Sequence, residues 1–287
     1  MSVIAEIRNE REDLARVLKK HTGIRRIVED LYPDSAHFIY ELLQNAEDTG
    51  ATEASFQLEQ DILVFQHNGR SFSKDDILAI TDIGEGTKSG DDDKIGRFGV
   101  GFKAVFAYCE TPMIWSPTFC FKISELVLPD EIAVKKELNG ATRFEFPFNN
   151  PKKVPDDAFD EITAGLNDLA ETTLLFLNSL ESISWQIGPG LSGNVLKMQH
   201  SDYHVEVLKQ LDGKTTESSH FLKFIEPVVG LTHQAVAIAY AMDFLPKNNQ
   251  FDSRKPISKQ LRITSATPGR VAVFFPAEKE NSGFRFH

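Results

Sequence analysis

Apolar residues recur along this chain with two periods, one helical and one strand-like. Over residues 3–20 they return at helical spacing within a charged segment, which predicts an exposed amphipathic helix. A second helix is predicted over 34–47 from the same spacing, ending at Gly50. Two short apolar runs then predict strands at 54–59 and 62–66, joined by a tight turn.

The rest of the chain is predicted to mix short helices with strands. Ser73 to Ile80 has the pattern of a short helix, with Ser73 as its N-cap and Asp76 three residues on. Further helices are predicted over 102–108 and 156–180. The predicted strands lie at 112–123, 142–148, 182–187, 203–210, 220–225, 235–243 and 270–275.

A break in the pattern around 149–153 predicts two domains. The first covers residues 1–150 and includes the N-terminal helix, and the second is a smaller α/β region over 151–287. The chain stops at His287 shortly after a predicted strand, so we expect it to be a piece of a longer protein.

Composition narrows the class of protein. With 287 residues, 41% hydrophobic and 22 of them phenylalanine, the chain can bury a core rich in aromatic rings. The net charge of −11 disfavours binding to nucleic acid or to an anionic membrane, because both need a cationic surface. No apolar stretch is long enough to span a bilayer, and only two cysteines are present. We therefore expect a cytoplasmic protein.

Three polar residues form a stripe on the predicted helix 34–47. Glu41, Asn45 and Asp48 follow one another at intervals of four and three residues, which places them on one face. A solvated face on an amphipathic helix gives the same pattern. The functional alternative is a magnesium site, because an amide oxygen is a hard ligand for Mg²⁺ and a carboxylate one turn earlier can deprotonate a water molecule.

A glycine-rich segment follows at residues 84–101. Gly96, Gly99 and Gly101 would let the backbone turn sharply and approach phosphate oxygens, although a tight structural turn has the same composition. The polar stretch before them contains Thr87 and Lys88, and it is either an ordinary loop or a lid that closes over a nucleotide. The P-loop and dinucleotide-binding patterns are both absent.

Taken in order, the segments ELLQNAEDTGAT, HNGRSF, GEGTK and IGRFGVGFKAVF resemble the GHKL ATPase superfamily. The likeness is closest to its sacsin and heat-shock-chaperone (heat-shock protein 90-like) branch, and it covers about residues 30–145. It implies the Bergerat fold, a two-layer α/β sandwich with a mixed, largely antiparallel sheet, accompanied here by the second α/β region.

The resemblance also implies a role for each matching position. Glu41 corresponds to the glutamate that activates water, Asn45 to the magnesium ligand, and Asp48 to a polar residue near the nucleotide. Thr87 and Lys88 fall in the lid, and Thr142 falls on a threonine that helps to bind adenine. The phosphate-binding turn would consist of Gly96, Phe98, Gly99, Val100, Gly101 and Phe102.

One position departs from the family pattern. Where the family has Asp-x-Gly, with an aspartate that accepts a hydrogen bond from the adenine amino group, this chain has His67, Asn68 and Gly69. A neutral imidazole nitrogen of His67 or the amide oxygen of Asn68 could accept the same bond, though less strongly than a carboxylate. His67 as an ordinary loop residue is the alternative.

These features predict an ATPase that uses Mg²⁺, binds ATP and hydrolyses it slowly as a conformational switch. The alternative is a nucleotide-gated protein-interaction module with little or no turnover. A histidine kinase is the least favoured hypothesis, since no helical hairpin with a phosphorylatable histidine is evident. The expected partners are ATP, a second copy of the chain in a nucleotide-dependent homodimer, and protein clients or attached domains; nucleic acid is not expected.

Overall fold

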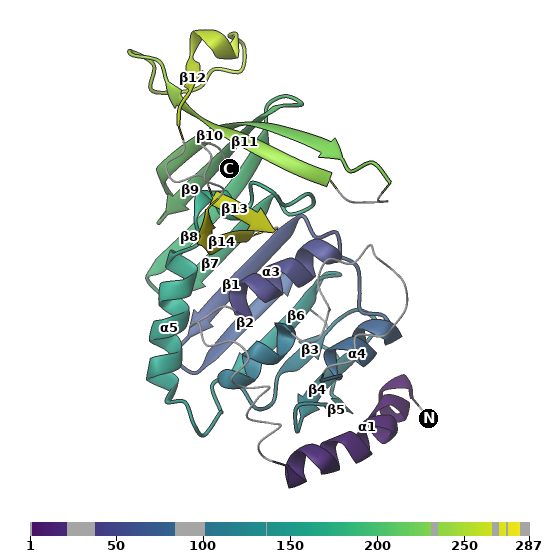
Figure 1. The fold of residues 1–287 in the computed structure, drawn as a ribbon. Helices are drawn as coiled ribbons and strands as arrows, with labels where there is room; N and C mark the ends of the chain where they lie inside the picture. The colour runs from purple at the N-terminus through teal and green to yellow at the C-terminus, as the bar shows by residue number, and fades with distance from the viewer. Residues whose placement is uncertain are drawn as a thin grey trace. The chain divides into compact units, whose positions relative to one another are not determined.

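The chain folds into two compact units of mixed α/β structure in the computed structural model (Figure 1). The first contains residues 1–168 and 184–192, and the second contains 169–183 and 193–287. The structure describes residues 2–21, 38–83, 101–135, 137–230, 235–265, 270–273 and 275–281.

An open sheet forms one layer of the first unit. Its strands follow the order β7-β1-β2-β6-β3-β4-β5, and every pairing from β1 to β5 along that order is antiparallel. The strands are β1 (Glu53–Glu59), β2 (Ile62–His67), β3 (Met113–Trp115), β4 (Cys120–Ser124), β5 (Leu128–Glu131), β6 (Thr142–Pro147) and β7 (Ser182–Ile187).

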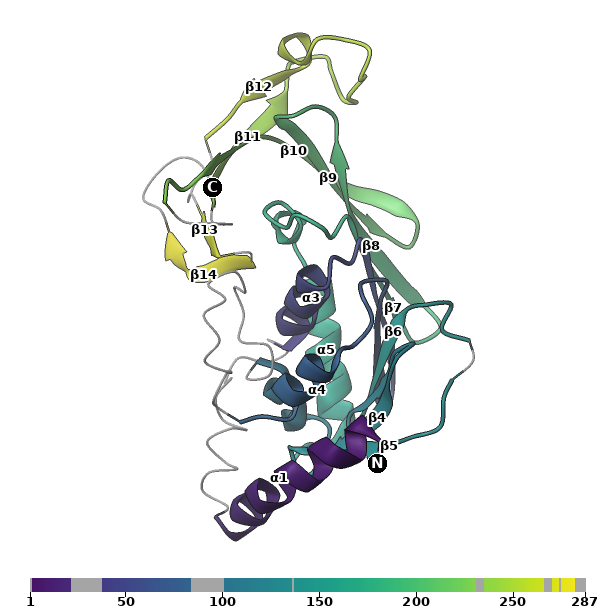
Figure 2. The ribbon, with the colours of Figure 1, turned by 90° about the vertical axis from the view of Figure 1, so that its right-hand side faces the viewer.

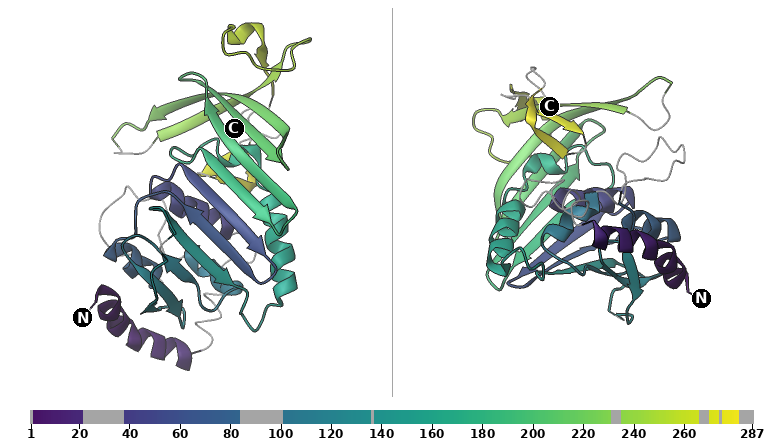
Figure 3. Two further views of the ribbon diagram at one scale, coloured as in Figure 1. Left: turned by 180° about the vertical axis from the view of Figure 1, so that it is seen from behind. Right: turned by 60° about the horizontal axis from the view of Figure 1, so that its bottom comes forward.

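Helices form the second layer and cover one face of this sheet (Figure 2). They are α3 (Phe38–Asp48), α4 (Lys74–Ile80), α5 (Pro155–Asn167) and the 3₁₀ helix η1 (Gly101–Ala107). Seen from behind, the opposite face of β1, β2 and β6 carries no described helix (Figure 3). Helix α1 (Val3–Lys20) packs beside the edge strand β5. None of the described helices is long and apolar enough to cross a membrane.

Phenylalanine rings fill the space between the two layers, as the composition predicts. Phe65 and Phe144 lie on adjacent strands with ring centroids 5.7 Å apart. Phe102 of η1 packs against them from the helical layer, 6.2 Å from the ring of Phe144 and 6.1 Å from that of Phe146. Because aromatic side chains bury large apolar areas, this cluster fixes η1 against β6.

Local sequence explains where the helices of this unit begin. The Ser2 hydroxyl caps α1 by accepting from the Ala5 amide, and four apolar residues of α1, Ile4, Ile7, Ala15 and Leu18, are buried. Helix α4 begins with a complete capping box between Ser73 and Asp76, as predicted. The predicted helix at 34–47 is confirmed from Phe38 onward, and residues 34–37 lie outside the described part of the chain.

The second unit is built mainly from long antiparallel strands. Its sheet runs in the order β8-β9-β10-β11-β12, and β13 pairs with β14 in a separate hairpin. The turn between β9 and β10 places Asp212 and Gly213 at φ of 49° and 73°, the left-handed backbone that a two-residue hairpin turn requires. Its elements are η2 (Glu171–Thr173), β8 (Leu191–Gln199), β9 (His204–Leu211), β10 (Lys214–Pro227), β11 (Ala235–Phe244), η3 (Ile257–Lys259), β12 (Leu261–Ile263), β13 (Arg270–Val273) and β14 (Phe275–Asn281).

Two sequence-based expectations about elements were wrong. The helix predicted over 156–180 ends at Asn167, because Asp168 caps it and the buried leucines that follow belong to irregular chain and η2. The run 112–123 contains a turn that separates β3 from β4. The helix predicted over 102–108 is confirmed as the 3₁₀ helix η1, whereas strands β5, β8, β12 and β14 were not predicted.

Candidate functional site

The polar stripe of α3 is only partly exposed to solvent. Asn45 is buried, with 9% of its surface exposed, Glu41 is half-buried, and Asp48 is exposed at the end of the helix. The opposite face of α3 is apolar and packs into the core through Phe38, Ile39, Leu42, Leu43 and Ala46. The amphipathic pattern therefore orients the helix so that Glu41 and Asn45 lie away from the deepest core but remain largely covered.

The Glu41 carboxylate lies directly against Gly101, the last glycine of the predicted phosphate-binding turn. A Cβ atom added at Gly101 would lie 1.7 Å from Oε2 of Glu41 and 2.3 Å from its Cδ. Only glycine leaves room for this approach, since any other residue would overlap the carboxylate. Two segments 60 residues apart in sequence, each singled out as functional, therefore meet in the fold.

His67 ends strand β2 on the helix-covered face of the sheet. In the β2–β6 register it stands opposite Thr142, and both side chains are buried. The backbone N–H of Gly69 donates to Nδ1 of His67 at 3.2 Å. Burial, and secondarily the positive charge of Arg70, lower the pKa of His67 to about 4, so the imidazole is neutral at physiological pH.

Asn68 and Gly69 hold the backbone around the start of β1. The amide oxygen of Asn68 accepts from the N–H groups of Thr52 at 2.9 Å and Glu53 at 3.0 Å. Gly69 lies against Thr49 at the end of α3, where an added Cβ would come within 2.0 Å of the threonine Oγ1. Both acceptors considered for the adenine amino group, on His67 and Asn68, therefore already accept backbone hydrogen bonds.

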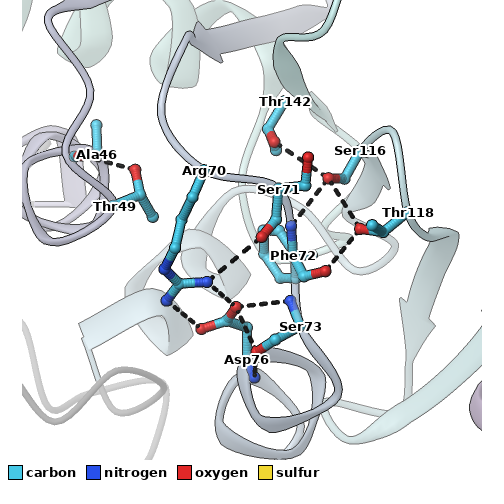
Figure 4. A network of polar contacts seen from close by, with 10 residues as sticks. All are labelled: Ala46, Thr49, Arg70, Ser71, Phe72, Ser73, Asp76, Ser116, Thr118 and Thr142. Atoms are coloured by element: carbon cyan, nitrogen blue, oxygen red, sulfur yellow. Dashed lines mark hydrogen bonds and ion pairs between the residues drawn. The ribbon is translucent and has the colours of Figure 1, made fainter.

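An ion pair that the sequence did not reveal joins the predicted capping box and fixes the chain after Gly69 (Figure 4). Arg70 donates to both oxygens of Asp76, at 2.5 and 2.9 Å. Burial alone would raise the pKa of Asp76, but hydrogen bonds from Arg70 and Ser73 bring it below its ordinary value. The capping residues were recognisable in sequence; their pairing with Arg70 was not, because nothing local specifies that side chain's direction.

Hydroxyl groups tie the same segment to the neighbouring strands (Figure 4). The Phe72 amide donates to Ser116 Oγ at 3.0 Å, and Thr118 Oγ1 donates to the Phe72 carbonyl at 2.6 Å. Thr142 donates to the same Ser116 hydroxyl at 3.3 Å. On the other side, the Arg70 amide donates to the Thr49 carbonyl at 3.0 Å. The segment that follows His67 is thus held from both sides, and the imidazole with it.

Most of the predicted lid and phosphate-binding turn lies outside the described residues. Thr87 and Lys88 of the predicted lid lie outside the described residues, as do four members of the predicted phosphate-binding turn, Gly96, Phe98, Gly99 and Val100. Of that turn, Gly101 and Phe102 are described: Gly101 begins η1, and the Phe102 ring belongs to the aromatic core. Among the described residues no group of three or more His, Cys, Asp or Glu side chains could hold a metal ion.

A cavity of about 550 Å³ lies elsewhere in the first unit. It is bounded by the β3–β4 hairpin, by Ile4 of α1 and by the segment around Lys135 and Leu138. No sequence-predicted site residue lines it. We therefore place the candidate site at the α3–η1 contact, where the polar groups converge, and not at this cavity.

Replacing Gly69 with alanine is expected to destabilise the first unit. The new Cβ would lie 2.8 Å from the Thr49 Cβ and 3.1 Å from the Ala51 amide nitrogen, atoms that cannot rotate away. We expect a loss of about 2–3 kcal/mol in urea unfolding. Gly190→Ala is the control, because nothing lies within 4 Å of its added Cβ, and it should change stability by less than about 0.5 kcal/mol. Equal stability of the two variants would contradict the close approach to Thr49.

Comparison with known proteins agrees with part of this picture. Residues 59–130, from the end of β1 into β5, match the family described as the Sacsin domain. Over 204 residues the chain is 30% identical to Protein NO VEIN of Arabidopsis thaliana, covering 61% of this chain and 8% of that protein. It is also 35% identical over 115 residues to Sacsin of Homo sapiens, covering 33% of this chain and 2% of that protein. The chain thus spans less than a tenth of either relative, and in the segment that carries His67, Gly69 and Gly101 it is similar to sacsin domains.

Proposed function

We propose that the first unit is a GHKL-type ATPase domain of Bergerat fold, which binds ATP with Mg²⁺ and hydrolyses it slowly as a conformational switch. The observation that carries this proposal is the contact between Glu41 and Gly101. It brings the proposed water-activating carboxylate against the proposed phosphate-binding turn, although neither segment specifies the other in sequence.

Helix α3 would run alongside the bound nucleotide. Gly101 contacts Glu41 near one end of the helix, and Gly69 contacts Thr49 just past the other end. At 1.5 Å per residue, the seven residues from Glu41 to Asp48 span about 10 Å, which is comparable to a nucleotide's length. The phosphates would therefore lie towards Glu41, and the base would lie towards His67 and Asp48.

The residues of this face suit a magnesium ion. Asn45 lies one helical turn from Glu41 and is largely shielded from solvent, and its amide oxygen is the hard donor that Mg²⁺ prefers. The ion, when bound with ATP, would neutralise charge on the phosphates. Asn45 would hold it, while Glu41 would accept a proton from the water molecule that attacks the terminal phosphorus.

The test of this proposal is nucleotide binding with and without magnesium. We expect calorimetric titration to show ATP binding to the intact chain in Mg²⁺, and Asn45→Ala to weaken the Mg²⁺-dependent affinity by roughly tenfold or more. Without Mg²⁺ the two proteins should bind ATP alike, because Asn45 acts through the ion.

Gln44→Ala provides a matched control on the same helix, since its side chain leaves α3 about 100° away from that of Asn45. It should keep the wild-type dependence on Mg²⁺. Failure of the wild-type chain to bind any purine nucleotide would exclude the proposed function. ATP binding without turnover would instead favour a nucleotide-gated interaction module. The nucleotide-dependent homodimer and the cytoplasmic setting stay predictions.

A further inference from the structure

His67 presents a hydrogen-bond donor and no free acceptor. A backbone N–H can only donate, so the contact from Gly69 at 3.2 Å makes Nδ1 the acceptor. A neutral imidazole carries its single proton on the other nitrogen, which is then Nε2. Burial and Arg70 keep the ring neutral by lowering its pKa to about 4. Within the described chain no group accepts a hydrogen bond from Nε2.

The ring is not free to exchange this donor for an acceptor. A flip about the Cβ–Cγ bond would take Nδ1 away from the Gly69 N–H and leave that buried donor unpaired. The rings of Phe65 and Phe144 lie 5.9 and 6.0 Å from the imidazole and enclose it. Gly69 itself is fixed against Thr49, so it cannot follow a flipped ring.

The neighbouring polar groups are already engaged in hydrogen bonds or ion pairs. The amide oxygen of Asn68 already accepts from two backbone N–H groups. The Thr142 hydroxyl, opposite His67 in the sheet, donates its proton to Ser116, and its oxygen keeps lone pairs that can accept a hydrogen bond. The charged group facing His67 is Arg70, a donor that is itself paired with Asp76. His67 therefore contributes a donor to this end of the site, where an aspartate would contribute an acceptor.

Purine bases differ at the atom that such a donor would meet. Adenine carries an amino group at position 6, which donates, whereas the 6-oxopurines carry a carbonyl oxygen, which accepts. A carboxylate at the His67 position would select the amino group. An N–H donor forms a hydrogen bond with the carbonyl oxygen, and it can meet adenine only through a ring nitrogen.

We infer that this site reads its base through the Nε2–H of His67 and binds 6-oxopurine nucleotides at least as readily as ATP. The inference rests on the proposed function, because that proposal places the base beside His67. It adds a ligand class that an acceptor at this position would exclude.

The test compares ITP with ATP, two nucleotides that differ in the base alone. In magnesium, calorimetric titration of the intact wild-type chain should give an ITP affinity equal to or higher than that for ATP. His67→Asn should keep this ratio, because an amide can accept from Gly69 and still donate. His67→Asp, which matches the asparagine variant in size but lacks a donor, should shift the ratio of affinities towards ATP by about tenfold or more. Thermal unfolding of each variant confirms that it is folded.

Each other result overturns the inference. A wild-type affinity that is measurably higher for ATP than for ITP would show that the base is read by an acceptor. An unchanged ratio in a folded His67→Asp variant would show that His67 does not contact the base, while leaving ATP binding by the domain intact. Absence of binding by both nucleotides to the wild-type chain would instead overturn the proposed function itself.

Discussion

Glu41→Gln should lower the rate of ATP hydrolysis by about 10²–10⁴-fold, the usual contribution of a general base. Glutamine keeps the size and shape of the side chain that contacts Gly101 but cannot accept a proton from water at neutral pH. Binding of ATP with Mg²⁺ should remain within about threefold of the wild type, since the carboxylate acts on the water and not on the ion. Phosphate release under single-turnover conditions measures the effect.

Gly101→Ala tests the same contact from the opposite side. The new Cβ would overlap the Glu41 carboxylate, which lies at the flexible end of its side chain and can swing away. We expect stability to fall little, by about 1 kcal/mol or less, while hydrolysis falls because the carboxylate is displaced. Retained fold with lost turnover is the signature of positioning.

Glu53→Gln is the control for these two variants, because Glu53 is an exposed residue of β1 that takes no part in the proposed site. It should hydrolyse ATP at the wild-type rate. If Glu41→Gln does the same, Glu41 is not the base. If the wild-type chain binds ATP and shows no turnover, the interaction-module alternative replaces the ATPase.

The parts of the fold that the sequence predicted well are those specified by neighbouring residues. Alternating apolar residues identified β1 and β2, and the Ser73–Asp76 spacing identified the N-terminus of α4. The polar stripe on α3 was visible for the same reason. The strands β5 and β8 were missed because the sequences LPDE and LSGNVLKMQ carry little apolar alternation, and their strand conformation depends on pairing with distant partners.

Contacts between distant residues could not be predicted in the same way. One example is the cluster of His200, His204, Glu206 and His220 in the second unit, whose histidines are up to 20 residues apart in the sequence. In the structure Nε2 of His204 lies 3.0 Å from Nδ1 of His220, and Nε2 of His200 lies 2.6 Å from the Glu206 carboxylate. Adjacent strands β9 and β10 bring His204 and His220 together, and their register is set by the whole sheet.

The candidate site likewise combines features set by neighbouring residues with contacts between distant residues. The candidate residue types were evident in the sequence. The two hydrogen bonds that the Asn68 oxygen accepts beside β1, and the tautomer of His67, could not be predicted, because they depend on backbone N–H groups that carry no sequence signal. A close approach can be read from a glycine only once its neighbour is known, as for Gly101 against Glu41 and Gly69 against Thr49.

Lys103 gives a further contact between residues distant in sequence, because its buried amine connects three elements. It follows Phe102 in η1, is 1% exposed, and its Nζ donates to the carbonyl of Ile80 at 2.6 Å and to that of Leu126 at 2.7 Å. Ile80 ends α4, and Leu126 lies in the turn between β4 and β5, where it adopts a left-handed φ of 70°. Lys103 therefore satisfies two backbone acceptors, one of them in a strained turn.

Lys103→Met is expected to destabilise the first unit by about 3–5 kcal/mol at pH 9–10, because methionine fills the same space but leaves both carbonyls without their donor. The effect should depend on pH. Burial is the main cause that lowers the pKa of Lys103, opposed by Asp82 and assisted by Arg11, to about 7 from 10.5. Between these two values the unfolded chain holds a proton that the folded chain has released, so wild-type stability rises with pH relative to the variant.

Urea unfolding of both proteins at pH 6.5 and 9.5 measures this difference. The gap between wild type and Lys103→Met should widen by roughly 3 kcal/mol over that interval, since each pKa unit is worth about 1.4 kcal/mol. Lys74→Met, at an exposed lysine of α4 that pairs loosely with Glu6, should cost less than about 1 kcal/mol and show no such widening.

A constant gap would mean that Lys103 stays charged in the folded protein up to pH 9.5. The two carbonyls would then stabilise the ammonium form enough to cancel the cost of burying it, and the link between η1, α4 and the β4–β5 turn would be a charge-assisted one throughout the physiological range.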